Sequence, residues 1–258
     1  MPRYFIEVSY KGTRYSGFQV QKNAVTIQSE VEKALEICFR KKFYLTGSSR
    51  TDAGVHALQN FFHFDSEGEL IYHGNDISGE IKNPDKYLYS LNSILPLDIV
   101  VKNIKKLPEN AHCRFDATTR EYRYHIYKEK NPFYREIAWY YPYMLNLKKM
   151  QEASNIILYT YDFTSFSKKN TQVNTFICSI NKSEWHIEKD LLIFSITGNR
   201  FLRGMVRGLV GTMLYVGTGK LSIPSFKSII ESKNNNRANF GVPAHGLFLV
   251  KVKYPYTV

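Results

Sequence analysis

The sequence predicts an α/β protein built from two domains. Segments with the two-residue period of strands alternate with segments of helical period in both halves of the chain. Pro108-Glu109-Asn110 interrupts this pattern, so we expect one domain over residues 1–107 and another over 108–258. With 258 residues, 43% of them hydrophobic, each half can bury a core. We expect two α/β domains whose antiparallel sheets join at a cleft.

The first half contains three predicted strands and two predicted helices. Alternation of apolar residues predicts strands over residues 3–10, 59–65 and 99–107. A helix begins at Thr26 with an apolar face, and another begins at Asn83-Pro84 and ends at Pro96. The apolar faces are formed by Ile27, Val31, Ala34, Leu35 and Cys38 in the first helix and by Tyr87, Leu91, Ile94 and Leu95 in the second. Residues 67–83 are polar and aperiodic, and we expect a long loop there.

The second half repeats this alternation. Residues 120–127 form a predicted strand with Tyr122, Tyr124 and Ile126 on one face, which a half-buried tyrosine strand alone would explain. Helices are predicted over 147–159 and 224–232, a hairpin about Lys189-Asp190 joins strands 180–187 and 191–197, and the last strand covers 247–254. Residues 199–214 are mostly apolar and predict a buried helix.

Composition favours a nucleic-acid partner. The formal charge of +12 and the 15% aromatic content suit phosphate contacts and stacking on unpaired bases, although a basic, solvated surface remains the alternative. No apolar run is long enough to span a membrane and no signal peptide is evident, so we expect a soluble, cytoplasmic protein. Three widely spaced cysteines indicate neither disulfides nor a zinc site.

The stretch from Gly47 to Ala57 is the best candidate for chemistry. It places ionisable and hydroxyl side chains and two glycines in a loop at a strand end, where a rigid sheet can hold reactive groups. Asp52 is the natural reactive group. The same residue types also form ordinary turns, but a plain turn needs neither Arg50 nor His56.

Read as a whole, Arg50-Thr51-Asp52-Ala53-Gly54-Val55-His56-Ala57 resembles the active-site motif of the tRNA pseudouridine synthase A family. The resemblance implies that Asp52 is the catalytic carboxylate. It continues in chain order to the C-terminus, through segments that begin at Tyr10, Thr26, Leu91, Arg120, Asp162, Asn199 and Val242. The chain departs from the family at Ser48-Ser49, in the longer loop before Asn83, and at Cys178, where relatives commonly carry Arg.

Two further catalytic assignments come from this resemblance. The first tyrosine of Arg120-Glu121-Tyr122-Arg123-Tyr124 matches the family's active-site tyrosine. The resemblance therefore implies an active-site role for Tyr122. A helix through Arg203 and Arg207 would place both on one face beside a groove of Gly204, Gly208 and Gly211, and a buried arginine needs a carboxylate or phosphate partner. An ion pair within the domain is the simpler explanation, but the resemblance implies that Arg207 pairs with Asp52.

The resemblance also implies the overall fold and reaction. We expect the pseudouridine synthase fold, with two ferredoxin-like halves around a central mixed sheet, acting as a homodimer without cofactor or metal. The expected reaction converts uridine to pseudouridine at positions 38, 39 and 40 of the tRNA anticodon stem-loop. Substrate contacts are expected from Lys11, Arg14, Arg50, His56, Tyr122 and Arg203.

Two other function classes fit part of the sequence. A non-catalytic RNA-binding module would explain the charge and the tyrosines. It would not explain a buried arginine that is expected to pair with Asp52. A carboxylate-dependent glycosidase would need a second acidic group, and no motif here supplies one.

Overall fold

The computed structural model describes the chain apart from residues 69, 71–83 and 170–172. The chain forms two compact units. Unit 1 comprises Met1–Thr118 with Lys251–Val258, and unit 2 comprises Thr119–Val250. This division falls later in the chain than the expected one after Leu107. The segment after Leu107 stays with unit 1 because Arg3 Nη1 donates to Ala111 O (2.8 Å) and Tyr254 Oη donates to Cys113 O (2.6 Å). As a statement about independent domains, the boundary at 107/108 remains a prediction.

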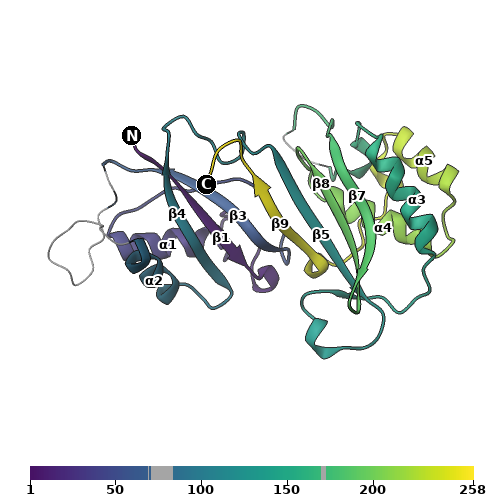
Figure 1. Ribbon diagram of the computed structural model, residues 1–258, viewed down its shortest axis with the longest axis horizontal. Coiled ribbons are helices and arrows are strands. Elements are labelled where there is room, and N and C mark those ends of the chain that lie inside the picture. Colours follow the sequence, from purple (N-terminus) through teal and green to yellow (C-terminus); the bar gives the residue numbers. More distant parts are fainter. Residues whose placement is uncertain (69, 71–83, 170–172) are drawn as a thin grey trace. The chain divides into compact units, whose positions relative to one another are not determined.

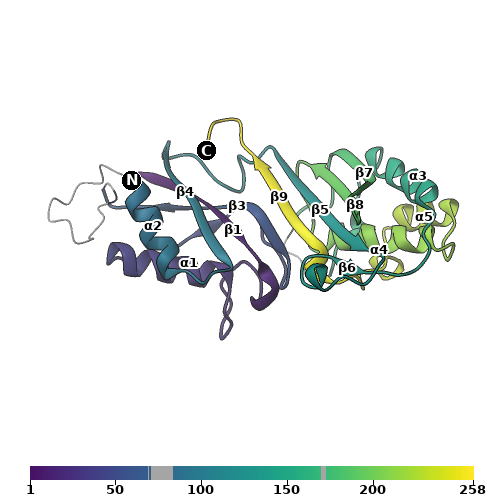
Figure 2. The ribbon, with the colours of Figure 1, turned by 60° about the horizontal axis from the view of Figure 1, so that its bottom comes forward.

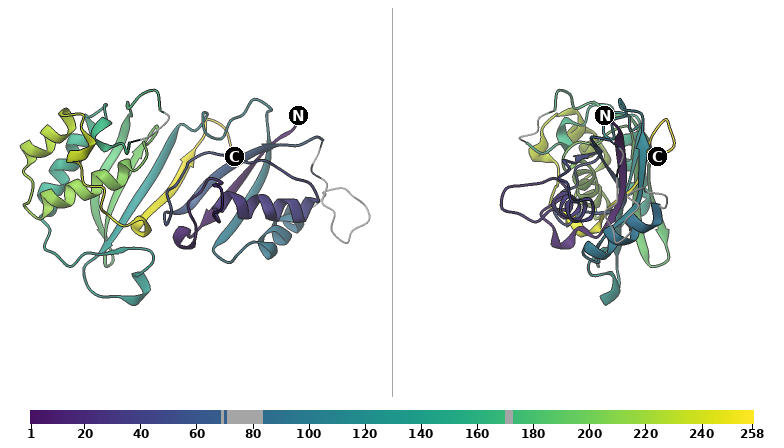
Figure 3. Two further views of the ribbon diagram at one scale, coloured as in Figure 1. Left: turned by 180° about the vertical axis from the view of Figure 1, so that it is seen from behind. Right: turned by 90° about the vertical axis from the view of Figure 1, so that its left-hand side faces the viewer.

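Unit 1 has the strand order of a ferredoxin-like fold. Its fourth strand pairs with the first, the first with the third, and the third with the second, all antiparallel. Two helices lie on one face of these strands (Figures 1 and 3). In chain order the elements are β1 (Arg3–Tyr10), α1 (Ile27–Phe39), β2 (Thr46–Gly47), β3 (His56–Asp65), α2 (Pro84–Ile94) and β4 (Ile99–Leu107).

Local sequence explains these elements well. Thr26 caps α1 through a hydrogen bond from Ser29 N, and Ser29 Oγ accepts from Thr26 N in return. The predicted apolar face of α1 is buried, whereas in the second helix Ile94 is 36% exposed and Leu95 lies beyond the last helical residue. The Asn83 cap and most of the expected loop over 67–83 lie outside the described residues.

Unit 2 repeats the same order with its own elements. The strands follow the order β9-β5-β8-β7, and β6 adds a short parallel pair to the end of β5, as Figure 2 shows. Helices α3, α4 and α5 contact one another and lie on one face of these strands (Figure 3). The elements are β5 (Thr119–Tyr127), β6 (Trp139–Tyr140), α3 (Leu147–Leu158), β7 (Ile180–Glu188), β8 (Leu191–Gly198), α4 (Met205–Gly217), α5 (Ile223–Glu231) and β9 (Leu247–Lys253).

The predicted ferredoxin-like halves and mixed sheet are therefore confirmed. The alternation of β5 is also confirmed, because Tyr122, Tyr124 and Ile126 are buried. Strand β9 runs through the division of the chain, its first four residues belonging to unit 2 and its last three to unit 1. No helix among the described residues is long and apolar enough to cross a membrane.

The start of α4 differs from the prediction. Gly204 adopts a left-handed backbone conformation (φ +75°) at the N-cap, so the helix begins at Met205. Arg203 therefore precedes the helix, is exposed, and does not share a helical face with Arg207. Two glycines of the expected groove do allow close packing: a methyl group would lie 2.7 Å from the Phe240 ring at Gly208 and 2.2 Å from Asn239 O at Gly211.

Candidate active site

The loop at residues 48–55 connects β2 to β3 in unit 1, as the sequence predicts. Its backbone is held at both ends and in the middle: Ser48 N donates to Phe61 O (2.8 Å), Phe18 N to Thr51 O (3.1 Å) and Val55 N to Asp52 O (3.2 Å). Asp52 is half-buried, so its carboxylate combines a fixed backbone with access to solvent. Such a loop can present a carboxylate to a substrate in a fixed position.

A buried hydrogen-bond network links this loop to β1 and β3. The hydroxyls of Tyr10 and Thr51 lie 2.7 Å apart, and Asn60 Nδ2 donates to both Tyr10 Oη (3.1 Å) and Ser49 O (2.9 Å). The side chains of Tyr10, Thr51 and Asn60 are all buried. Buried polar groups that satisfy one another in this way fix a backbone more firmly than isolated contacts do.

Two glycines pack the N-terminal segment against the same loop. A methyl group on Gly12 would lie 2.0 Å from Val55 O, and one on Gly17, whose φ is +103°, would lie 3.1 Å from Thr51 O. Only residues without a side chain allow this approach. The glycines that follow β1 therefore shape the backbone on either side of Asp52.

His56 belongs to the support of the loop. Its side chain is 1% exposed, and its Nδ1 accepts a hydrogen bond from Gly12 N (3.0 Å). This burial leaves no accessible ring face for a ligand. We therefore attribute a structural role to His56 in place of the substrate contact that we expected.

The other expected substrate contacts of unit 1 differ in how they are held. Arg50 is exposed and lies two residues before Asp52 in the sequence. Arg14 pairs with Asp98 through Nε and Nη2 (both 2.8 Å) but remains 70% exposed, and Lys11 N donates to Asp98 O (2.9 Å). Although burial alone would raise the pKa of Asp98, hydrogen bonds from Tyr15 and Arg14 outweigh it and lower that pKa. Asp98 is therefore ionised at neutral pH and holds Arg14 in place at the surface.

A hollow of about 200 Å³ lies beside the loop and is lined by residues from four segments. Arg50, His112, Arg114 and Phe115 form its polar and aromatic side, and Phe115 is 75% exposed. The Phe115 ring lies 4.2 Å from the His112 ring, and Arg114 Cζ lies 5.7 Å from the Phe115 centroid. An exposed ring beside two arginines can accept a stacked base.

This aromatic position is rigid because hydrogen bonds close the turn that carries it. His112 N donates to Asp116 Oδ2 (2.7 Å), and His112 Nδ1 accepts from Arg114 N (3.1 Å). Burial and the nearby Arg3 charge lower the pKa of His112, so its ring is neutral at pH 7 and can accept that bond. Sequence reasoning missed Arg114 and Phe115, although an aromatic residue next to arginine was the available signal.

In unit 2, Tyr122 and Arg207 come from different elements. Tyr122 lies in β5, is 8% exposed and packs edge-on against Phe201, with ring centroids 5.0 Å apart. Arg207 lies in the first turns of α4 and is half-buried; its Nε and Nη2 both donate to Val242 O, at 2.9 and 2.6 Å. Two hydrogen bonds to one carbonyl fix the plane of the guanidinium.

The segment that holds Arg207 is itself attached to β5. Tyr124 Oη donates to Pro243 O (2.8 Å), and Gly246 packs so closely on Tyr124 that a methyl group there would lie 2.7 Å from the ring. The Val242 carbonyl thus positions Arg207, and no side-chain pattern could reveal that contact. The described residues contain no cluster of His, Cys, Asp or Glu suited to a metal ion.

Comparisons with known proteins show the family to which the chain belongs. A family model described as tRNA pseudouridine synthase matches residues 6–116 and 160–255. The chain is 44% identical over 255 residues to the tRNA pseudouridine synthase A of Azobacteroides pseudotrichonymphae, covering 99% of this chain and 98% of that protein. It is 44% identical over 257 residues to that of Bacteroides fragilis (99% and 98%) and 38% identical over 251 residues to that of Bacillus subtilis (96% and 97%). The chain belongs to the tRNA pseudouridine synthase family.

Proposed function

We propose that this protein is an isomerase that converts uridine to pseudouridine in tRNA, with Asp52 as the catalytic carboxylate. The observation that carries the proposal is the half-buried Asp52 on a loop held by the Tyr10, Thr51 and Asn60 network. Membership of the family supplies the reaction class. The reaction breaks the N-glycosidic bond, rotates the uracil, and joins its C5 to C1′, so a fixed carboxylate next to the ribose is its minimal requirement.

Asp52 can act in either of two ways. As a nucleophile it would attack C1′ and release uracil, and as a base it would remove the C2′ proton so that uracil leaves by elimination. Deuterium at C2′ distinguishes them, because only the second route breaks that C–H bond. A substantial isotope effect on the single-turnover rate would support proton abstraction, and its absence would support attack at C1′.

We propose that Arg207 and Tyr122 complete the catalytic group. Arg207 would form a charge-assisted pair with Asp52 and orient that carboxylate. The two hydrogen bonds to Val242 O support this role, because they hold the guanidinium plane ready for a bidentate partner. Tyr122 would stack on the target base through its ring and assist the chemistry through its hydroxyl.

The flipped-out state of the target uridine needs partners outside the catalytic group. We propose that Arg50 stabilises it, with Phe115 and Arg114 stacking on an unpaired neighbouring base in the adjacent hollow. Lys11, Arg14 and Arg203 would contact phosphates. The exposed positions of Arg14 and Arg203 support this assignment.

We further propose that the modified positions are 38, 39 and 40 in the anticodon stem-loop and that the protein acts as a cytoplasmic homodimer. Sequencing of pseudouridine sites in tRNA treated with the pure protein tests the positions. Analytical ultracentrifugation tests the dimer. Modification at other tRNA positions, or a monomer at micromolar concentration, would contradict these finer statements.

Tritium release from tRNA labelled at C5 of uridine tests the function itself. Joining C5 to C1′ displaces the C5 hydrogen into water, so a pseudouridine synthase releases tritium in proportion to product. An RNA-binding module would bind the tRNA without release. A glycosidase would instead liberate free uracil and leave an abasic site.

A further inference from the structure

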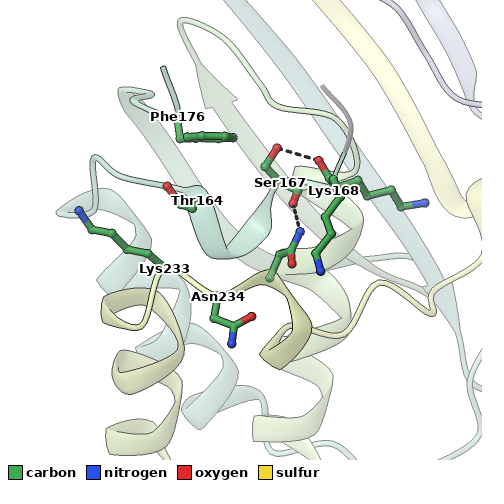
Figure 4. A pocket seen from close by; sticks show the side chains of 8 residues that line it. Thr164, Ser167, Lys168, Phe176, Lys233 and Asn234 are labelled. Atoms are coloured by element: carbon green, nitrogen blue, oxygen red, sulfur yellow. Dashed lines mark hydrogen bonds between the residues drawn. The ribbon is translucent and has the colours of Figure 1, made fainter. Parts of the chain in front are cut away.

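A second hollow lies in unit 2, and nothing in the proposed reaction uses it. It has a volume of about 520 Å³, within the size range of ligand sites, and is lined by Thr164, Ser167, Lys168, Lys169, Phe176, Lys233, Asn234 and Asn235. Figure 4 shows the Phe176 ring on one side and Asn234 on the opposite side, with Thr164 between them. The described lining thus combines cationic, amide and hydroxyl groups with one aromatic ring.

The charge of this hollow is positive. None of its described lining residues is acidic, and Lys233 Nζ pairs with Asp162 Oδ2 at 2.8 Å. Burial alone would raise the pKa of Asp162, but hydrogen bonds from Lys233 and Thr164 outweigh it and lower that pKa. One ionised carboxylate therefore balances one of three ammonium groups, which leaves two positive charges on Lys168 and Lys169.

The hollow is a fixed feature of the fold. Lys168 N donates to Arg203 O (2.9 Å), Asn235 Nδ2 donates to Ser167 O (2.8 Å), and Ser165 Oγ donates to Ile229 O (2.6 Å). The stem of Lys168 also crosses Gly204, where a methyl group would lie 3.0 Å from its Cγ. The backbone that carries Lys168 is thereby attached to the residues that precede α4 and to the segment after α5.

We infer that this hollow binds the phosphodiester backbone of the tRNA, at a place separate from the target uridine. Ammonium groups bind phosphate oxygens as point charges, the amides of Asn234 and Asn235 can add hydrogen bonds, and the partly exposed Phe176 ring offers a face to an unpaired base. The inference rests on the proposed function, because it takes tRNA as the substrate. It assigns to unit 2 a share of substrate affinity that is independent of the chemistry.

The test compares two double variants in the full-length protein. Lys168→Gln with Lys169→Gln removes the two unbalanced charges, and Lys148→Gln with Lys149→Gln removes two adjacent exposed lysines from α3 in the same unit. Both lose the same net charge, so a general electrostatic effect is common to both. Affinity for an unmodified tRNA transcript is measured as a function of salt, alongside the single-turnover rate at saturating enzyme and the melting temperature.

We expect the Lys168/Lys169 variant to bind tRNA at least about tenfold more weakly at 0.1 M salt than the control variant. Its plot of log Kd against log salt should be shallower by about 1.4 to 1.8, at roughly 0.7 to 0.9 for each lost phosphate contact. The saturated rate and the melting temperature should remain those of the wild type. Equal affinities and equal salt slopes in the two variants would overturn the inference.

The outcome is separable from that of the proposed function. If the wild type releases no tritium from tRNA, the proposed function fails whatever the lysines do. If the wild type is active and the Lys168/Lys169 variant loses saturated rate without losing affinity, the hollow acts on the chemistry and the phosphate assignment is wrong.

Discussion

The two units share one strand order but differ at one equivalent connection, the one between the second and third strands. In unit 2, β7 and β8 pair continuously from Lys182–Thr197 to Glu188–Leu191, after one irregularity at Asn181, and Lys189 and Asp190 alone form the turn. In unit 1, the strand equivalent to β7 is reduced to Thr46–Gly47, and residues 48–55 form an open loop before β3. The loop that carries Asp52 thus replaces a regular hairpin.

The two connections are stabilised in different ways. Backbone ladder bonds hold the β7–β8 hairpin, at the cost of a left-handed conformation at Lys189 (φ +54°). The 48–55 loop has no such ladder. It is held by hydrogen bonds from the side chains of Tyr10 and Asn60 and by the close packing of Gly12 against its backbone. A loop can therefore be fixed without regular structure when buried polar groups replace the ladder.

The largest expected effect after Asp52 itself concerns the contribution of unit 2. Arg207→Ala should reduce the single-turnover rate by roughly 100- to 1000-fold, because it removes a preorganised charge from the proposed catalytic group. It should also lower the free energy of unfolding by about 1.5 to 3 kcal/mol through loss of the charged hydrogen bonds to Val242 O.

Arg207→Lys is the matched control for this change. It keeps the charge but not the planar fork, so we expect poor rescue of the rate. A lysine variant as fast as the wild type would show that charge alone suffices. An unchanged rate in the Arg207→Ala variant would show that Arg207 of unit 2 takes no part in the reaction.

The packing of Gly12 against the loop gives the next effect. Gly12→Ala places a methyl group 2.0 Å from Val55 O, so the backbone next to Asp52 must shift, and a shift of about 1 Å can cost on the order of 100-fold in rate. Gly219→Ala is the control, because Gly219 has open space around it and a φ of +77°. We expect that variant to lose about 1 kcal/mol of stability and no activity. Equal rates for the two variants would show that the packing of Gly12 does not control the reaction.

Loss of a hydrogen bond in the Tyr10, Thr51 and Asn60 network of unit 1 should reduce activity more than loss of the buried Ser154–Ser183 hydrogen bond of unit 2. Tyr10→Phe leaves Thr51 and Asn60 without their shared partner, and Ser183→Ala removes a buried hydroxyl 2.8 Å from Ser154 Oγ. Each change should cost about 1 to 3 kcal/mol in urea unfolding. Only Tyr10→Phe should slow the reaction, by roughly tenfold, and a similar slowing in both would mean that stability alone controls the rate.

The smallest effect is expected at the regular hairpin. Asn adopts the left-handed conformation more readily than Lys, so Lys189→Asn should raise the free energy of unfolding by less than about 1 kcal/mol. The reaction rate should not change. A change in rate would show that this hairpin is coupled to the catalytic loop.

Local patterns predicted the elements well. Residue patterns predicted β1, β4, β7 and β8 nearly to the residue, although consecutive residues on both faces are buried in β1 and β8. The start of α4 was missed because apolar content continues through Leu202 while the backbone turns at Gly204. The position of the Asp52 loop was predicted from its residue types and its place between strands.

What holds that loop could not be predicted. Tyr10 and Thr51 are 41 residues apart in sequence, and Arg207 is 35 residues from its Val242 carbonyl partner. Periodicity describes only near neighbours, and a backbone carbonyl leaves no trace in residue type. His56 shows the converse error, since a histidine beside a reactive loop suggests a ligand contact until its burial is known.

Single-turnover tritium release by the Asp52→Asn variant, on tRNA labelled at C5 of uridine, tests most directly whether Asp52 is the catalytic carboxylate. Asn keeps the size of the side chain but can act neither as nucleophile nor as base, and the loop backbone should be retained. We expect no detectable release, and tRNA affinity within a few-fold of the wild type, because phosphate contacts dominate binding. Detectable turnover by a pure Asp52→Asn sample would contradict the assignment of the catalytic carboxylate.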